Sequence, residues 1–435
     1  MNKIILFTGV FAFSFFASAQ NSVLKSKITQ KAASLESKVI TWRRDFHQNP
    51  ELGNREFKTA EKIAVHLRSL GIEVQTGVAK TGVVGILKGG KPGPVVALRA
   101  DMDALPVKER VNIPFASKVD GEYNGQSVGV MHACGHDSHI AMLMGTAEIL
   151  ASIKSELKGT VKFIFQPAEE GAPEGEEGGA ALMVKEGVLQ NPKVDVIFGL
   201  HISAQMEVGK INYRPKGAMA SSDWFKIKIK GKQSHGASPW QSIDPIVTAS
   251  QIIIGLQTIV SRNVNLTESA AVVSVGKITA GVRSNIIPEE LEMAGTIRTL
   301  DKKVQEMIHN RLKQITTNIA ESAGATAEVS ITKQTLITYN DPILTEKMVP
   351  TLESVAGKNN ILLAPAATGA EDFSYYQDKI PGFFFFLGGM PKGTNAAETA
   401  SHHTPDFYID ESGFVLGMKA MSNLTLDYME INAKK

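Results

Sequence analysis

The sequence predicts an α/β fold in two domains, in which a domain with a mainly parallel β-sheet is interrupted by an inserted α+β domain of ferredoxin-like type. Three observations support this prediction. At 435 residues the chain is too long for one ordinary hydrophobic core. Short continuous apolar runs bounded by glycine and proline indicate strands that helices cover on both faces. Near residue 215 the pattern changes to apolar-polar alternation, which is typical of a strand with one solvated face.

Residues 1–19 have the features of a secretory signal peptide. Lys3 supplies a positive start, residues 4–16 form an apolar run, and residues 17–19 give a small-x-small cleavage pattern. The run is too short for a stable membrane span, although an uncleaved anchor is the alternative. We therefore expect an exported protein, periplasmic or secreted, that begins at Gln20 and does not bind a membrane.

The first domain is expected to begin with two helices, which are followed by buried strands. The helices span residues 23–48 and 57–70, and Gly71 is placed to end the second. The predicted strands span residues 83–87, 95–98, 161–165 and 194–200.

Polar side chains directly follow three of these strands. Asp101 and Asp103 follow the second, Glu169 and Glu170 the third, and His201 the fourth. Open α/β sheets build their sites at the carboxyl ends of strands, so we expect these groups to share one crevice.

The inserted domain is expected at residues 215–332. Its strands are predicted at 224–231, 270–278, 291–299 and 326–332, and its helices at 245–262 and 304–319. This β-α-β-β-α-β order is that of a ferredoxin-like unit. The first domain would therefore be discontinuous and comprise residues 20–214 and 333–435, with further elements at 342–356, 382–387 and 411–429.

Composition excludes some classes of function. A formal net charge of +2 leaves no basic footprint for nucleic acid. Export would normally favour paired cysteines, yet Cys134 is the only cysteine. We therefore expect its thiolate to be occupied, and a metal ion is a natural occupant.

Residues 131–139 hold this cysteine and three of the ten histidines. Cys134 and His136 can face one point only if the backbone bends, which Gly135 permits. A lone Cys-x-His is a weak signal; it is strengthened by candidate donors beyond predicted strands or in a late loop. These are Glu169, Glu170, His201 and His403. Thiolate, imidazole and carboxylate donors together suit zinc, manganese, cobalt or nickel.

The adjacent carboxylates of Glu169 and Glu170 would be costly to bury together unless cations offset them. Two metal ions would do so, and one glutamate could then bind metal while its neighbour acts as a general base toward water. The alternative is a solvated acidic loop, which we favour for Glu174, Glu176 and Glu177.

Seven motifs follow one another along the chain, among them His132-Ala133-Cys134-Gly135-His136-Asp137. They lie at residues 98–106, 132–137, 165–171, 199–201, 231–237, 284–288 and 369–373. Together they resemble the M20 metallopeptidase family, in the branch of aminoacylases, hippurate hydrolases and indole-acetyl-amino-acid hydrolases. The resemblance covers nearly all of the chain after residue 19. It implies a zinc-exopeptidase-like catalytic domain with two divalent metal ions per subunit, and an inserted lid domain through which a homodimer forms.

The resemblance also assigns roles to residues of the first domain. Glu169 would be the general acid/base, and Cys134 would bridge the two metal ions. The implied metal ligands are Cys134, His136, Glu170, His201 and His403. Asp101 and Asp103 would orient these ligands, although Asp101 stands where many relatives have a ligating histidine.

In the lid domain, the resemblance implies that His235 stabilises the oxyanion in the partner subunit's active site. Asn285 and Arg298 would contact the substrate. The alternatives are a capped surface histidine and an arginine satisfied within its sheet. Trp240 departs from the family pattern, which commonly has histidine there, and the loop at 169–179 is longer than usual.

The implied reaction is hydrolysis of the amide bond of an N-acyl amino acid to a carboxylate and a free amino acid. Glu169 would activate water and return the proton to the leaving amine. A dipeptidase or carboxypeptidase acting on short peptides is the alternative within the family. Two other classes remain open, a hydrolase with Cys134 as nucleophile and a non-catalytic exported binding protein.

Overall fold

The computed structural model describes residues 9–433 of the chain, and the side chains from residue 21 onward. The predicted signal peptide at residues 1–19 lies partly outside the described residues, and its cleavage stays a prediction. Within the described residues, no helix is both long enough and apolar enough to cross a membrane.

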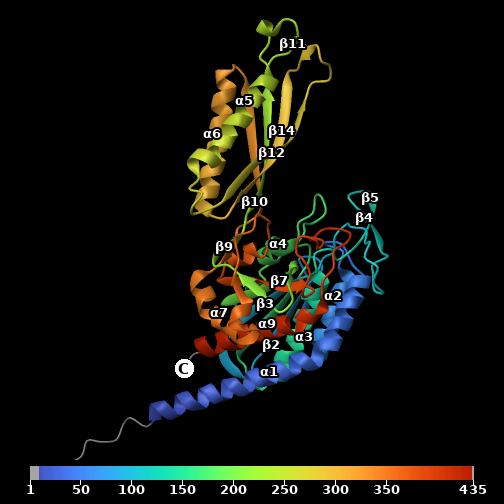
Figure 1. Cartoon of the computed structure of the whole chain (residues 1–435), viewed down its shortest axis with the longest axis vertical. Coiled ribbons are helices and arrows are strands. Elements are labelled where there is room, and N and C mark those ends of the chain that lie inside the picture. The colour runs from blue at the N-terminus through green and yellow to red at the C-terminus, as the bar shows by residue number, and fades with distance from the viewer. Residues whose placement is uncertain (1–8, 434–435) are drawn as a thin grey trace, which may run out of the picture. The chain divides into compact units, whose positions relative to one another are not determined.

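The chain divides into two compact units (Figure 1). Unit 1 comprises the described part of Met1–Tyr213 together with Asp341–Ala364 and Lys379–Lys435, and unit 2 comprises Arg214–Asn340 and Pro365–Asp378. Residues 333–340 and 365–378 therefore group with unit 2, whereas the sequence placed them in the first domain. One reason is the short strand β16 (Thr338–Asn340), which pairs with β9 (Lys216–Met219) and is too brief to leave a pattern.

Unit 1 is built on an eight-stranded sheet with the order β1-β2-β6-β3-β7-β18-β8-β17. Its central strands run parallel, because β3 pairs in parallel with β6 and β7, and β7 with β18. The strands are β1 (Glu73–Val78), β2 (Gly82–Lys88), β3 (Lys91–Asp101), β6 (Lys158–Gln166), β7 (Val196–Glu207), β8 (Ile211–Tyr213), β17 (Ile361–Leu363) and β18 (Gly382–Met390). The carboxyl ends of the parallel strands therefore lie at one edge of the sheet. A separate ribbon is formed by β4 (Asp120–Tyr123) and β5 (Gln126–Gly129).

Helices pack around this sheet. Both α3 and α9 contact β3, and α1 contacts both of these helices, while α2 contacts β1 and β2. The helices of unit 1 are α1 (Gly9–Gln48), α2 (Phe57–Ser69), α3 (His136–Ser152), α4 (Gly179–Lys185), α7 (Pro342–Ala356) and α9 (Phe414–Asn432). The sequence did not predict α3. It is buried along almost its whole length, so it has no polar face and no amphipathic pattern.

Unit 2 contains an antiparallel four-stranded sheet with the order β12-β14-β10-β15. Its strands and the two helices that pack with them are β10 (Ser222–Lys230), α5 (Pro245–Thr258), β12 (Ala271–Ala280), β14 (Glu290–Thr299), α6 (Lys302–Ser322) and β15 (Thr326–Thr335). Along β10, Phe225, Ile227 and Ile229 are buried in a core that includes residues of both helices, and the intervening lysines are exposed. This unit also holds α8 (Ser374–Gln377) and a ribbon of β11 (Ser234–His235) with β13 (Ile286–Ile287).

The predicted fold class is confirmed. A mainly parallel sheet with packed helices forms one unit, and a β-α-β-β-α-β arrangement forms the core of the other.

Candidate metal centre

The turn before α3 positions two of the predicted ligands. Gly135 has φ +93°, and a Cβ atom there would lie 2.5 Å from Cγ2 of Ile202. Glycine therefore allows the chain to turn between Cys134 and the first residue of α3, His136. The Nδ1 atom of His136 donates to the carbonyl oxygen of Asp103 at 2.9 Å, which leaves the lone pair on Nε2. That buried Nε2 atom has no hydrogen-bond partner among the described residues, as expected for a ligand atom.

His201 is oriented like His136, with Nδ1 as the donor and the lone pair on Nε2. It lies within β7 rather than beyond the end of the strand, and its Nδ1 donates to the carbonyl oxygen of Ile202 at 2.6 Å. Its Nε2 lone pair therefore faces Sγ of Cys134, 3.4 Å away. A backbone bond that fixes the tautomer in this way is typical of metal-binding histidines.

His403 joins this cluster from a distant part of the chain. Its Nε2 lies 3.2 Å from Sγ of Cys134 and 2.9 Å from Oε1 of Glu170. Together with Glu169, the five predicted ligands fall into overlapping groups of three, and in each group the candidate ligand atoms lie within 4.8 Å of one another. These groups are Cys134, His136 and His201; Cys134, Glu170 and His403; and His136, Glu169 and Glu170.

The two adjacent glutamates lie mostly buried beside His136. Side-chain exposure is 9% for Glu169 and 15% for Glu170, and their nearest carboxylate oxygens lie 3.8 and 3.9 Å from His136 Nε2. Two carboxylates so close together in a buried place need compensating positive charge. The donor set, its mixed chemistry and the unpaired Nε2 atom all fit divalent transition-metal ions.

Asp101 and Asp103 lie behind the candidate ligands. The carboxylate of Asp101 is fully buried and contacts Nδ1 of His139 at 2.6 Å and Nη1 of Arg99 at 2.5 Å. Asp103 Oδ2 accepts the amide of Glu170 at 3.0 Å, and its carbonyl holds His136 as described above. Both contacts fit the orienting role predicted for these aspartates.

Two further histidines border the cluster, and their hydrogen bonds favour support over metal binding. Nε2 of His139 accepts the amide of Ile202 at 2.8 Å, and Nε2 of His402 accepts the amide of Ala204 at 3.1 Å. Since Nε2 is the acceptor, each neutral ring carries its proton on Nδ1. His402 therefore points an N–H at Sγ of Cys134, 3.6 Å away, which would stabilise a thiolate.

The electrostatics of the cluster show how strongly it attracts positive charge. Burial raises the pKa of the Cys134 thiol well above its usual value, and the carboxylates of Glu170 and Glu169 raise it further. Burial disfavours a charged His136 ring, but Asp101 and Asp103 outweigh this effect and raise its pKa to about 10. A divalent cation would be attracted by the same carboxylates, so metal ions and protons compete for binding to this cluster.

A buried ion-pair network behind α3 was not anticipated from the sequence. Asp137 follows His136, and its Oδ2 contacts Nε of Arg43 at 2.9 Å and Nδ1 of His47 at 2.7 Å. Despite burial, Arg43 and His47 hold the pKa of Asp137 well below its usual range. Arg43 and His47 are four residues apart on a predicted helix, so their shared face was visible in the sequence, but their partner was not.

In unit 2, His235 and Asn285 lie side by side. The amide of Gly236 donates to the carbonyl oxygen of Asn285 at 2.8 Å, next to the β11-β13 pairing. Nδ1 of the exposed His235 accepts the amide of Ala237 at 2.9 Å, so its Nε2 carries the proton and can donate it. Arg298 lies half-buried in β14, and burial lowers its pKa while Asp223 opposes the shift.

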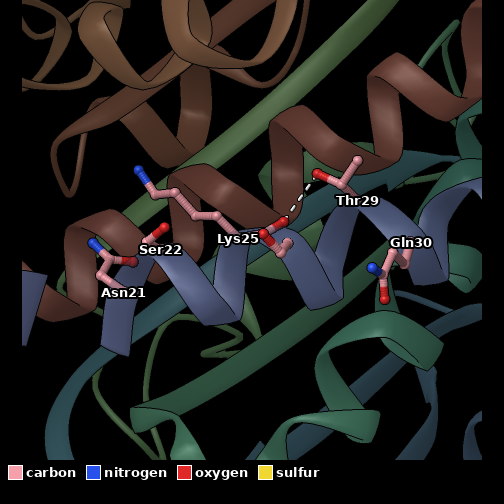
Figure 2. Close-up of a pocket in the computed structure, with 6 residues that line it drawn as sticks. Asn21, Ser22, Lys25, Thr29 and Gln30 are labelled. Atoms are coloured by element: carbon pink, nitrogen blue, oxygen red, sulfur yellow. Dashed lines mark hydrogen bonds between the residues drawn. The ribbon is translucent and has the colours of Figure 1, made fainter. Parts of the chain in front are cut away.

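A polar hollow of about 560 Å³ lies elsewhere, along α1. Figure 2 shows its lining side chains projecting from this one helix, with the hydroxyl of Thr29 bonded to the carbonyl oxygen of Lys25 at 2.9 Å. None of its lining residues belongs to the candidate metal centre. The lining residues are Asn21, Ser22, Lys25, Ser26, Thr29 and Gln30.

Comparison with known proteins identifies the family. Residues 97–427 match the description "Peptidase family M20/M25/M40", which covers well over half of the chain. The chain belongs to peptidase family M20/M25/M40. The resemblance seen in the sequence is thereby confirmed, and this M20 protein is a metal-dependent hydrolase.

Individual relatives match over nearly their whole length. An N-acetylcysteine deacetylase of Bacillus subtilis is 40% identical over 91% of this chain and 98% of its own. Thermostable carboxypeptidase 2 of Saccharolobus solfataricus is 39% identical over 93% and 99% of the two chains. Among solved structures, the YXEP protein of Bacillus subtilis, a dinuclear metal-binding peptidase from the M20 family, matches with a TM-score of 0.77 and 38% identity. That match covers 92% of this chain and 99% of the other.

Proposed function

We propose that this M20 protein hydrolyses the amide bond of N-acyl amino acids to a carboxylate and a free amino acid. The observation that carries the proposal is the meeting of five metal-type donors beside the mostly buried carboxylate of Glu169. Similarity to an N-acetylcysteine deacetylase supports the substrate class.

In this proposal Cys134, His136, Glu170, His201 and His403 hold two divalent metal ions. When bound, these ions would polarise the scissile carbonyl and lower the pKa of water at the site. Similarity to a dinuclear metal-binding M20 peptidase supports the number of ions. Asp101, Asp103 and the N–H groups of His139 and His402 then orient the ligands or stabilise their charge, as their hydrogen bonds indicate.

Glu169 moves the proton. Its carboxylate takes a proton from the attacking water as the new C–O bond forms at the acyl carbon. It then gives this proton to the amide nitrogen as the C–N bond breaks, so that the leaving group departs as a neutral amine. The carboxylate is thereby regenerated, and one water is consumed for each amide cleaved.

The proposal also gives roles to three residues of unit 2. His235 carries its proton on Nε2 and can donate it to the developing oxyanion, in a homodimer that places it at the partner subunit's catalytic centre. Arg298 can pair with a substrate carboxylate, and Asn285 can contact the substrate. The export of the protein, directed by residues 1–19, also belongs to this proposal.

A carboxypeptidase acting on short peptides is the second candidate, since a thermostable carboxypeptidase is 39% identical to this chain. The amide chemistry is the same, so only substrate contacts separate the two. Comparing the hydrolysis of acetyl, benzoyl and indole-acetyl amino acids with that of dipeptides separates them. Higher kcat/KM for the N-acyl amino acids supports the first proposal, and higher kcat/KM for the dipeptides supports the second.

Chelation tests the metal requirement. Activity should be lost on treatment with a chelator and return with manganese, zinc or cobalt. A hydrolase that used Cys134 as nucleophile would instead resist chelation and lose activity on thiol alkylation. Activity that survives complete metal removal would contradict the proposal.

A further inference from the structure

Two buried carboxyl groups hold the backbone on either side of Glu169. The amide of Ala168 donates to Oε1 of Glu56 at 2.9 Å. The amide of Glu170 donates to Oδ2 of Asp103 at 3.0 Å. Each neighbour of the proposed general base is thus fixed by a side chain from a distant segment.

The backbone at this turn needs such support. Ala168 has φ +49°, in the left-handed region that is unfavourable for an ordinary L-residue. A strained conformation of this kind persists only where surrounding contacts impose it. The hydrogen bond from the Ala168 amide to Glu56 is one such contact.

Glu56 is itself firmly anchored. The residue is 0% exposed, and its Oε2 accepts the hydroxyl of Thr81 at 2.6 Å. Burial and the nearby carboxylate of Asp103 raise the pKa of Glu56 to about 7. Burying an ionisable carboxyl group lowers the stability of the fold, and buried groups with a shifted pKa are common at functional sites.

Helix capping does not explain Glu56. It occupies the position before α2, yet its side chain makes no cap hydrogen bond. The first turn of α2 is capped by Glu51, whose carboxylate accepts the amides of Lys58 at 3.2 Å and Thr59 at 2.8 Å.

The same segment also packs tightly against the turn. A Cβ atom on Gly53 would lie 3.0 Å from the carbonyl oxygen of Gly171 and 3.2 Å from Cβ of Ala168. Gly53 therefore supports the turn at 168–171 by close packing, in addition to the hydrogen bond that Glu56 accepts from the Ala168 amide.

We propose that Glu56 is a positioning residue that holds the Ala168–Glu170 turn so that the Glu169 carboxylate is aimed at the reacting water. The proposal rests on the role proposed for Glu169. Glu56 touches neither substrate nor metal; it acts through the amide of Ala168.

The test compares Glu56→Leu, Glu56→Gln and the matched control Glu51→Leu, each reconstituted with manganese. Because misplacing a catalytic group by about 1 Å can cost ~100-fold, Glu56→Leu should lower kcat ~10–100-fold and change KM less than ~3-fold. The content of bound metal should stay at the wild-type value. Glu56→Gln keeps an oxygen that can accept the Ala168 amide, so its kcat should remain close to that of the wild type. Glu51→Leu removes a helix cap and should lower the melting temperature without lowering kcat.

Wild-type kcat in Glu56→Leu would overturn the proposal, as would an equal loss of kcat in Glu51→Leu. If Glu56→Leu does not fold, Thr81→Val removes only the hydroxyl that anchors Glu56. A lowered kcat at unchanged KM in that variant would support the proposal, and an unchanged kcat would overturn it.

Glu169→Gln separates this inference from the proposed function. If Glu169→Gln is inactive while Glu56→Leu is fully active, only the positioning role fails. If Glu169→Gln retains turnover, the proposed function fails first, and with it the role of Glu56.

Discussion

At the scale of single residues, backbone hydrogen bonds decide which nitrogen of each histidine can bind metal. His136 and His201 donate Nδ1–H to carbonyl oxygens and keep the Nε2 lone pair for a ligand. His139 and His402 accept backbone amides at Nε2, so each carries its proton on Nδ1 and offers a hydrogen-bond donor there. The difference separates ligands from supporting groups among four clustered histidines.

We predict that Glu169→Gln lowers kcat by ~10²–10⁴-fold, the usual contribution of a general acid/base. The amide is nearly isosteric but cannot take up a proton. Steady-state kinetics on the metal-loaded variant measures this, with Glu177→Gln, a change in an exposed glutamate of the same loop, as the control. Wild-type turnover in Glu169→Gln would show that another group moves the proton.

His132 leads to a prediction about pH. It is buried, neither ring nitrogen has a hydrogen-bond partner among the described residues, and burial lowers its pKa to about 4. The unfolded chain, with a histidine pKa near 6.5, binds this proton more readily, so the contribution to stability is present above pH 6.5 and is lost as the pH falls toward 4. Between pH 7.5 and 5 the wild type should lose about 2 kcal/mol that His132→Leu does not lose.

Melting temperatures at both pH values measure this difference, with the metal-free forms compared throughout. An equal drop in the wild type and in His132→Leu would mean that His132 does not titrate on unfolding.

At the scale of elements, the turn from Cys134 into α3 connects fold and site. The helix begins at His136, α1 supports its first turn through Arg43 and His47, and β7 supplies His201. The sequence predicted the ligands on this turn but not the helix that carries one of them. Cys134 and His136 could be predicted from their residue types, whereas a helix that is buried on all sides shows no alternation of apolar and polar faces in its sequence.

Gly135→Ala should therefore damage stability and metal binding together. The new Cβ would combine an unfavourable φ of +93° with a 2.5 Å approach to Ile202. Gly187→Ala is a matched control, because Gly187 has φ +84° with nothing within 4 Å. We expect both variants to melt earlier and only Gly135→Ala to lose metal. Equal metal content in the two variants would contradict the role given to this turn.

At the scale of the whole molecule, the sequence predicted two units and the type of fold in each. The strand runs and the alternation in β10 were sufficient, because the two sheets differ in whether one face or both faces are covered. The full extent of unit 2 in the sequence was not predicted, because its last parts contain only short elements such as β16 and α8. Partners such as Glu56 with Ala168 also escaped prediction, because they join segments far apart in the chain.

The central claim is that five donors from separate parts of the chain meet to hold a pair of metal ions. Its most direct test is the metal content of the purified chain after saturation with zinc and removal of the excess, measured by elemental analysis. We predict two ions per chain in the wild type and fewer in Cys134→Ala, because its thiolate lies both in the group with His136 and His201 and in the group with Glu170 and His403. A content of one ion or none in the wild type, or an unchanged content in Cys134→Ala, would contradict the account.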